Sequence, residues 1–248
     1  MPNHRRHYQN SPITEAVIDI RAELSAEFRP EFLDSIGVRL NNAYPKRDDL
    51  NLFQGQFTIG VGATSTQAKL GYLLRSGDGK YVFQARTNGF TLSRLAPYDK
   101  WEPFRDEARR LWEIYKDVAK PIRVIRVASR SINRIDIPFP QVEVSDYLRT
   151  YPEISEDLPQ FLSGYVMQLL IPQMEFDGML SLIQATVPAQ RPETTSLSLD
   201  IDMFKESSSH FESDQNIWTF LEYLRDKKNE VFEGCITDRA RELFGTVA

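Results

Sequence analysis

The 248-residue chain contains few of the side chains that most often carry catalysis or bind metals. Cys235 is its single cysteine, which excludes an intrachain disulfide and a zinc site built from cysteines. Its three histidines are His4, His7 and His210, and we expect the first two to lie in a flexible lead-in. A serine–histidine–acid triad would have to use His210, whose neighbouring serines are too close in sequence to be its nucleophile. We therefore predict no catalytic residues.

Long apolar runs and phosphate-binding loops are also missing. No run approaches the roughly 18 apolar residues that a membrane span needs, so we predict no membrane association. The start of the chain, MPNHRRHYQNSP, has no apolar core of a secretory signal, and we expect a cytoplasmic protein. Neither a Gly-x-Gly-x-x-Gly nor a Gly-Lys-Ser loop occurs, so we predict no cofactor.

The composition is that of an ordinary globular protein, but the charge is unevenly distributed. Residues 1–140 carry 22 Lys and Arg against 16 Asp and Glu, a net charge of +6, whereas residues 141–248 carry 8 against 19, a net charge of −11. Such a split indicates either a basic half that meets a polyanion or two halves that complement each other. We favour the second interpretation, because no long flexible tether separates the halves.

Hydrophobic periodicity predicts an α+β fold in which a curved antiparallel sheet packs on long helices. The expected strands are 16–24, 52–61, 68–75, 81–95, 123–137, 163–171, 178–187 and 195–204, and the expected helices begin near Pro30, Trp101, Asp214 and Thr237. The resulting organisation is a flexible N-terminus (1–11), a first α+β half (12–137), a Pro-rich connection (138–160) and a second α+β half (161–248). Trp101 with residues 113–115 aligns with Trp218 and residues 230–232 at identical spacing, which predicts a tandem pseudo-repeat.

Three local patterns carry further expectations. Asp99 and Glu102 have the spacing of a helix capping box. Acidic residues flank the basic cluster in LRDKKNEVF (Arg225, Lys227 and Lys228), which is typical of a solvated helix face. Cys235 continues the apolar stripe Ile217, Leu221, Leu224 and Val231, which indicates a buried structural thiol.

Several fragments together resemble a known family. They are SPITEAVIDI, the hairpin segments GYLL and YVFQ, FTLSRLAPYDKW, SINRIDIP, LDIDMF and LRDKKNEVFEGCITDRARELF. In this order they are similar to a sporadically distributed, functionally uncharacterised prokaryotic family of about 250 residues, over residues 11–245. The resemblance implies no reaction, cofactor or catalytic residue. A patchy distribution implies an accessory gene, of the kind found with mobile elements, toxin–antitoxin pairs or phage defence.

The segment RVIRVASRSINRIDIPF places like charges along one side of a predicted strand. Residues four apart on a strand share a face and lie about 13 Å apart. Arg126, Arg130, Arg134 and Asp136 therefore point one way with Val124, Ala128 and Ile132, and the alternate, mostly apolar set faces a helix. Asp200 and Asp202 share a face of a later strand and are candidate partners. We interpret the six charged residues first as an internal ladder of ion pairs between the halves.

Three functions remain open on this evidence. The leading hypothesis is a non-enzymatic interaction protein whose acidic second half binds a protein partner. The first alternative is a module that uses the three arginines to bind an anionic small molecule or nucleic acid, with Tyr72, Tyr81, Phe83 and Phe90 as stacking platforms. The second is a metal-dependent enzyme that holds magnesium with Asp136, Asp200 and Asp202, although the arginines would compete for these carboxylates, so we predict no metal.

Overall fold

The computed structural model describes residues 6, 8–58, 62–160, 162–207 and 211–245. Its strands are β1 (Ile13–Glu23), β2 (Lys46–Thr58), β3 (Gly62–Arg75), β4 (Tyr81–Arg86), β5 (Gly89–Leu95), β6 (Arg123–Ile137), β7 (Val166–Gln173), β8 (Gly178–Val187) and β9 (Thr195–Glu206). Its helices are α1 (Asp34–Leu40), α2 (Trp101–Ala119), α3 (Asp214–Cys235) and α4 (Asp238–Phe244), with short 3-10 turns at Pro30–Leu33 and Val144–Asp146. The three histidines lie outside the described residues.

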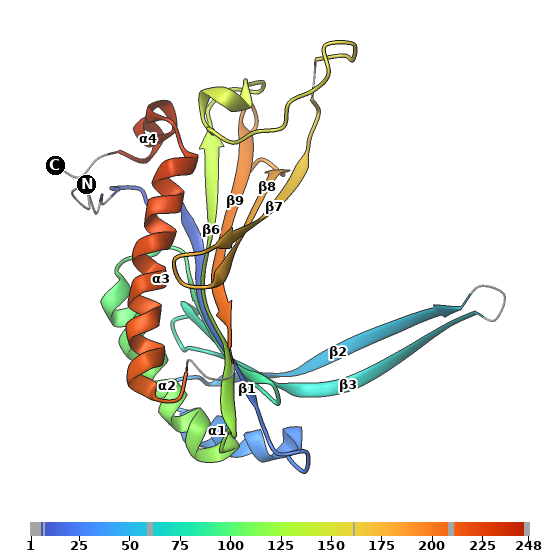
Figure 1. Cartoon of the computed structure of the whole chain (residues 1–248), viewed down its shortest axis with the longest axis vertical. Helices are drawn as coiled ribbons and strands as arrows, with labels where there is room; N and C mark the ends of the chain where they lie inside the picture. Colours follow the sequence, from blue (N-terminus) through green and yellow to red (C-terminus); the bar gives the residue numbers. More distant parts are fainter. Residues whose placement is uncertain (1–5, 7, 59–61, 161, 208–210, 246–248) are drawn as a thin grey trace.

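The described strands form one open, antiparallel sheet in the order β2-β3-β4-β5-β1-β6-β9-β8-β7. β1 and β6 pair at its centre, and the meanders β2–β5 and β7–β9 lead outward from them. The α2 and α3 helices lie along one face of the sheet (Figure 1). The β2–β3 hairpin projects away from the opposite face, because only Gly71–Arg75 of β3 pair with β4. The fold is therefore α+β with a large antiparallel sheet, as the sequence predicts.

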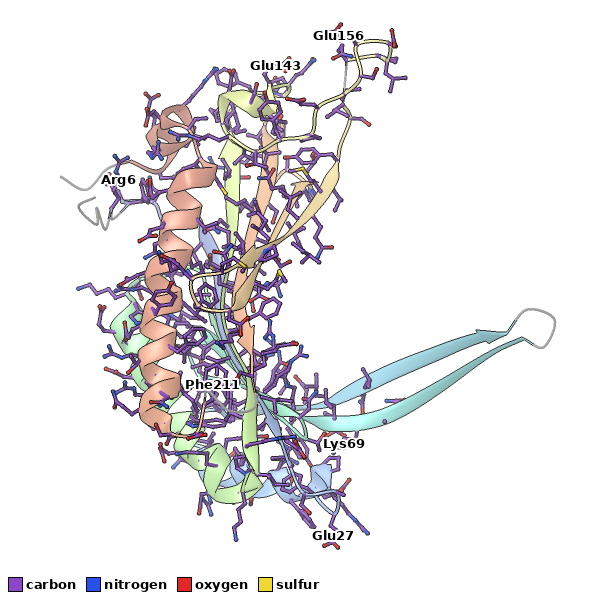
Figure 2. The ribbon with its side chains drawn as sticks, in the orientation of Figure 1. Arg6, Glu27, Lys69, Glu143, Glu156 and Phe211 are labelled. Atoms are coloured by element: carbon purple, nitrogen blue, oxygen red, sulfur yellow. The ribbon has the colours of Figure 1, made fainter. Side chains whose placement is uncertain are left out.

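The core fills the space between the sheet and the helices. Ile18 and Ile20 of β1 are completely buried, and Leu199 and Ile201 of β9 extend the same apolar surface into the second half. The apolar stripe of α2 is buried throughout: Trp101, Phe104, Ala108, Leu111, Trp112 and Tyr115. Figure 2 shows Glu143 and Glu156 in the Pro-rich connection at one end of the molecule and Glu27 at the other. Of the helices described, none combines the length and apolar character needed to cross a membrane.

The segment predicted as a strand over 81–95, in which Asn88-Gly89 indicates a bulge or a second tight turn, is the hairpin of β4 and β5 and turns at Thr87 and Asn88. Gly89 follows the turn with φ of 142°, and a Cβ there would lie 2.3 Å from the Ile20 carbonyl oxygen of β1. Glycine is required because the turn brings two backbones closer than any side chain permits.

The predicted capping box does not form. The α2 N-cap is Lys100, which makes no side-chain capping bond. Asp99 instead accepts from Arg94 Nη2 at 2.8 Å. Arg94 is buried, and its positive charge needs a counter-charge. The exposed amides at the start of α2 can instead form hydrogen bonds with water, so Asp99 binds Arg94 and does not cap the helix.

Two further expectations are wrong because side chains face the core. Tyr72, Phe83 and Phe90, proposed as stacking platforms, are buried in the hydrophobic core. Val124, expected beside the arginines, is also a core residue. A register shift between β1 and β6 places Ala22 opposite Val124 and Arg21 opposite Arg126, which leaves Ile125 as the extra residue and turns Val124 to the other face.

The described part of the N-terminal segment is held in place, although we predicted flexibility over 1–11. The backbone N–H groups of Gln9 and Asn10 donate to the carbonyl oxygens of Gly245 and Phe244 at 3.1 and 2.8 Å. The Tyr8 ring packs edge-on against Phe244. The same prediction for residues 1–5 and 7 falls outside the described residues.

Candidate functional site

The predicted arginines lie on the face of the sheet opposite α2 and α3, and Arg126 is the most buried of them. It donates to Asp19 Oδ1 of β1 at 2.8 Å and to Asp202 Oδ2 of β9 at 2.9 Å. Asp19 also accepts from Arg86 and Thr91. Burial alone would raise the pKa of Asp19, but Arg86, Thr91 and Arg126 outweigh burial and hold this pKa below its usual range.

The other two arginines are also bound by the chain itself. Arg130 makes a bidentate contact with Asp200, with Nε 2.8 Å from Oδ1. Arg134 Nε donates to Asp136 at 2.9 Å, and its Nη2 donates to Ser196 Oγ at 2.9 Å. These guanidinium groups are therefore engaged by carboxylates from within the chain, and they lie away from the helix layer.

The aspartates proposed as magnesium ligands are not all brought together. Asp200 and Asp202 lie opposite Ile132 and Arg130 on β6, whereas Asp136 lies opposite Ser196, at the far end of the pairing. Among the described residues, no group of three or more His, Cys, Asp or Glu side chains is arranged to hold a metal ion.

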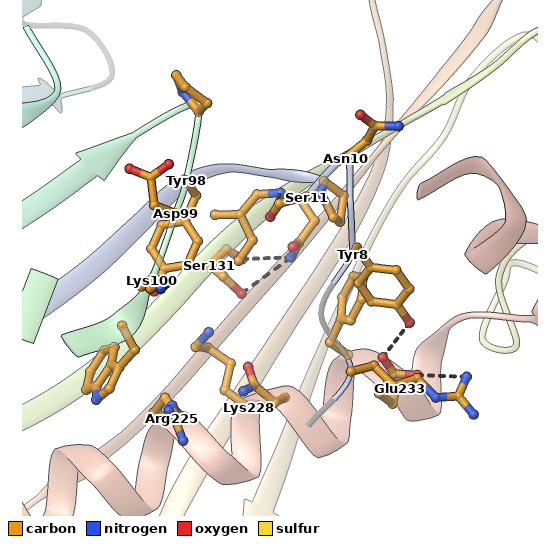
Figure 3. Close-up of a pocket in the computed structure, with 18 of the residues that line it drawn as sticks. Tyr8, Asn10, Ser11, Tyr98, Asp99, Lys100, Ser131, Arg225, Lys228 and Glu233 are labelled. Carbon is orange, nitrogen blue, oxygen red and sulfur yellow. Dashed lines mark hydrogen bonds and ion pairs between the residues drawn. The ribbon is translucent and has the colours of Figure 1, made fainter. Parts of the chain in front are cut away.

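A cleft of about 1330 Å³ opens between the sheet and α3, beside the start of α2 (Figure 3). We call it the inter-layer cleft. Its walls come from the N-terminal segment, the β5–α2 connection, β6 and α3, and they include Tyr8, Tyr98, Trp101, Ser131, Asn133, Arg225 and Lys228. Lys228 extends from α3 toward the strand that carries Ser131 (Figure 3). The cleft therefore joins segments from both halves of the chain.

Helical periodicity explains why Lys228 lies inside the protein. The buried residues Leu221, Leu224, Lys228 and Cys235 follow one another at spacings of three, four and seven, so position 228 belongs to the apolar stripe. Lys228 is thus the polar member of an apolar face, and only 6% of its surface is exposed. The predicted solvated basic cluster is wrong for Lys228 and Arg225, which are both buried, and holds only for Lys227.

The sheet carries a matching polar stretch. Ser129, Ser131 and Asn133 lie on the helix-facing side of β6 and are each at most 2% exposed, between the core residues Val127 and Ile135. Asn133 Nδ2 donates to the Leu199 carbonyl oxygen at 2.9 Å and more weakly to Ser131 Oγ at 3.4 Å. The apolar packing is therefore interrupted in both layers where α3 crosses β6.

The acidic residues that line the cleft already have partners other than Lys228. Asp99 is bound by Arg94, Glu102 and Asp226 by Arg225, Glu230 by Lys227, and Glu233 by Tyr8 and Arg241. Among the described residues, Lys228 Nζ makes no hydrogen bond or ion pair. Burial, and secondarily the positive charge of Arg225, lower the pKa of Lys228 to about 8.

Arg225 lies one turn before Lys228, and one of its two carboxylate contacts is short and the other is long. It contacts Asp226 at 2.5 Å and Glu102 at 3.5 Å, and its guanidinium is 6.0 Å from the Trp101 ring centroid. The Glu102 side chain is 55% exposed, so water weakens this ion pair.

Two tyrosines complete the walls. Burial raises the pKa of Tyr98, so its hydroxyl keeps its proton at neutral pH. Burial and the 2.6 Å hydrogen bond to Glu233 raise the pKa of Tyr8 to about 12. Both residues therefore present neutral aromatic surface to the cleft.

Sequence reasoning missed this site, although two signals were present. Position 228 falls in the α3 stripe, and Ser129, Ser131 and Asn133 fall on the helix-facing side of β6. Cys235, which we predicted to be a buried structural thiol, is buried, and burial raises its pKa to about 11.

Neither a comparison with protein-family models nor one with curated proteins finds a match to this chain, so the family resemblance stays a prediction.

Proposed function

We propose that this protein binds a small organic anion in the inter-layer cleft, and that Lys228 is the principal group that recognises its negative charge. The observation that carries this proposal is a buried lysine ammonium that points into a cleft and has no acceptor among the described residues. An unpaired buried charge is costly, and a bound carboxylate or phosphate would remove that cost.

The form of the cleft supports the proposal. Ligand pockets combine apolar and aromatic walls with a few polar groups, and they are common where two structural units meet. Tyr8, Tyr98 and Trp101 supply the aromatic walls, while Ser131 and Asn133 supply polar groups opposite Lys228. The volume of about 1330 Å³ leaves room for a small organic molecule and for water around it.

A thermal-shift titration with a panel of small carboxylates and phosphates tests this function. A ligand at 100 times its Kd should stabilise the protein by about 2.7 kcal/mol, or roughly 5 to 10 °C in a chain of this size. Lys228→Met should abolish the shift. Lys227→Met is the matched control, because Lys227 lies one position away, does not line the cleft, and pairs with Glu175 and Glu230. Equal shifts in both variants would contradict the proposal.

A second candidate is the protein-binding role predicted from the charge split. Edge strand β7 and its turn expose Val166, Leu170 and Met174 by 78, 62 and 89%. Glu175 and Asp177 lie next to Met174 in the β7–β8 turn. We infer that a basic protein with an apolar contact surface binds there. This chain would then act with that partner as an accessory or defence component of the cell.

Co-purification from the native host tests this second role. Leu170→Arg should remove the partner, because it puts a positive charge against a basic surface. Val38→Arg is the matched control, since the exposed fraction of Val38, 70%, is similar to that of Leu170, but Val38 lies on α1 and not on β7. A partner retained equally by both variants would overturn the assignment to β7.

We also infer that the two halves are a tandem pseudo-repeat, which would place the cleft at their junction. The pairing supports this inference. If β6 is counted with the second half, the first strand of each half pairs with its last, as β1–β5 and β6–β9, and a long helix follows the last strand. An experimental structure in which no twofold rotation carries β1, β5 and α2 onto β6, β9 and α3 would contradict it.

A further inference from the structure

The surroundings of Lys228 suit a reactive amine as well as an anion-binding group. A lysine becomes a nucleophile at neutral pH when it is desolvated or lies beside another cation, because both effects favour its neutral form. Lys228 has both features, since it is buried and Arg225 lies one helical turn away. A nearby carboxylate would reverse the effect, and the acids lining the cleft are bound to other groups.

Resting on the proposed function, we propose that Lys228 Nζ forms an imine with the carbonyl carbon of an oxo acid bound in the inter-layer cleft. An oxo acid has a carbonyl group and a carboxylate, and each has a partner in the cleft. Its carbonyl faces Lys228, and its carboxylate replaces the exposed Glu102 on Arg225, whose contact with Glu102 is 3.5 Å long.

The reaction balances without an oxidant, reductant or metal. The neutral amine attacks the carbonyl carbon, a C–N bond forms, and the carbonyl π electrons move to oxygen, which takes a proton. The carbinolamine then loses this oxygen as water while the nitrogen lone pair forms the C=N bond. The two Nζ protons of the neutral amine, passed directly or through solvent, become the two hydrogens of the released water, so amine and carbonyl give imine and one water.

The wall opposite Lys228 offers a donor for the carbonyl oxygen. Ser131 Oγ accepts from Asn133 Nδ2, so its own hydroxyl proton is free to point toward a ligand. The phenolic proton of Tyr98 is also retained, because burial raises its pKa. Donors placed where negative charge develops on oxygen favour the addition step. Among the described residues lining the cleft there is no cysteine or histidine to compete as nucleophile.

Trapping with glyoxylate and cyanoborohydride tests the proposal on the full chain at pH 7. Cyanoborohydride reduces an imine to a stable secondary amine, so peptide mass spectrometry locates each carboxymethyl group that results. A pKa of about 8 gives Lys228 roughly 300 times more neutral amine at pH 7 than an ordinary lysine with a pKa near 10.5. The lower basicity of the Lys228 amine and the restricted access of reagents to the cleft reduce that advantage. We therefore expect Lys228 to be labelled about 10- to 100-fold faster than Lys227.

Lys228→Arg is the discriminating variant, because it keeps a cation in the cleft and removes the reactive amine. It should keep the thermal shift caused by glycolate, the unreactive hydroxy analogue of glyoxylate, and should lose the trapped adduct. Labelling of Lys228 no faster than Lys227 in the wild-type protein would overturn the imine proposal. If the glycolate shift persists in that case, anion binding stands alone, and if it is absent as well, both proposals fail.

Discussion

Arg126 and Lys228 are two buried cations in very different surroundings. Arg126 lies between Asp19 and Asp202, which provide two negative charges at hydrogen-bonding distance. Lys228 lines the inter-layer cleft with Ser131, Asn133 and Tyr98, and no carboxylate of the described residues is bound to it. The first arrangement holds strands from the two halves together. The second leaves a charge for a ligand to satisfy.

The residue-scale prediction concerns Arg126→Met. The substitution leaves Asp19 and Asp202 buried without their shared partner, and we expect a loss of about 3 to 5 kcal/mol in the free energy of unfolding. Arg21→Met is the matched control, because Arg21 pairs directly opposite Arg126 and also approaches Asp19, but half of its side chain is exposed. It should change stability by no more than about 0.5 kcal/mol. Equal losses in urea denaturation would show that the buried pairs are not the cause.

At the element scale, alternation and helical stripes were enough to place most elements. β8 and the starts of α2 and α3 lie where periodicity predicts them, and the side-chain oxygen of Thr237 accepts from the Ala240 amide at the start of α4. These features depend on local spacing, which the sequence displays directly. Asp99 was misassigned because its competing partner, Arg94, is buried by the fold and not by its neighbours in sequence.

The cleft was harder to predict for a similar reason. A lysine in an apolar stripe is normally expected to reach solvent with its long side chain, because burial of its charge is unfavourable. Whether Lys228 does so depends on what covers α3, and β6 covers it with Ser131 and Asn133. That contact joins residues about a hundred positions apart. No spacing rule reports it.

Gly89 supplies the element-scale prediction. Gly89→Ala should disrupt the contact of β5 with β1 and cost about 3 kcal/mol or more, because its Cβ would lie 2.3 Å from the Ile20 carbonyl oxygen. Gly79→Ala in the β3–β4 turn is the control. Gly79 also has positive φ, at 71°, but its Cβ would meet nothing within 4 Å, so only the backbone strain of about 1 kcal/mol remains. Thermal unfolding of both variants separates the two costs, and equal losses would contradict the clash.

On the scale of the whole molecule, the uneven charge is partly neutralised inside the protein. Arg126 and Arg130 of the basic half bind Asp202 and Asp200 of the acidic half, and Arg105 of α2 binds Glu222 of α3 at 2.9 Å. The two halves therefore complement each other across the centre of the sheet and across the helix layer. The charged residues of these contacts are engaged within the chain, whereas Lys228 has no such partner among the described residues, and the proposed anion site depends on it.

The pH dependence of folding stability tests this claim most directly. Below pH 8 both the folded and the unfolded protein carry the Lys228 ammonium, so the full cost of its burial is present. Between pH 8 and 10.5 the folded protein releases this proton first, and the wild-type protein gains stability relative to a variant without the lysine.

The measurement is the difference in free energy of unfolding between Lys228→Met and the wild-type protein, taken by urea denaturation from pH 6 to 10.5 without ligand, with Lys227→Met alongside. We predict that Lys228→Met is the more stable protein at pH 7, and that its advantage falls by about 3 kcal/mol as the pH approaches 10.5. Lys227→Met should be no more stable than the wild-type protein at pH 7, and its stability difference should not fall in this way as the pH rises. A difference for Lys228→Met that is independent of pH would contradict a buried, unpaired ammonium and with it the proposed anion site.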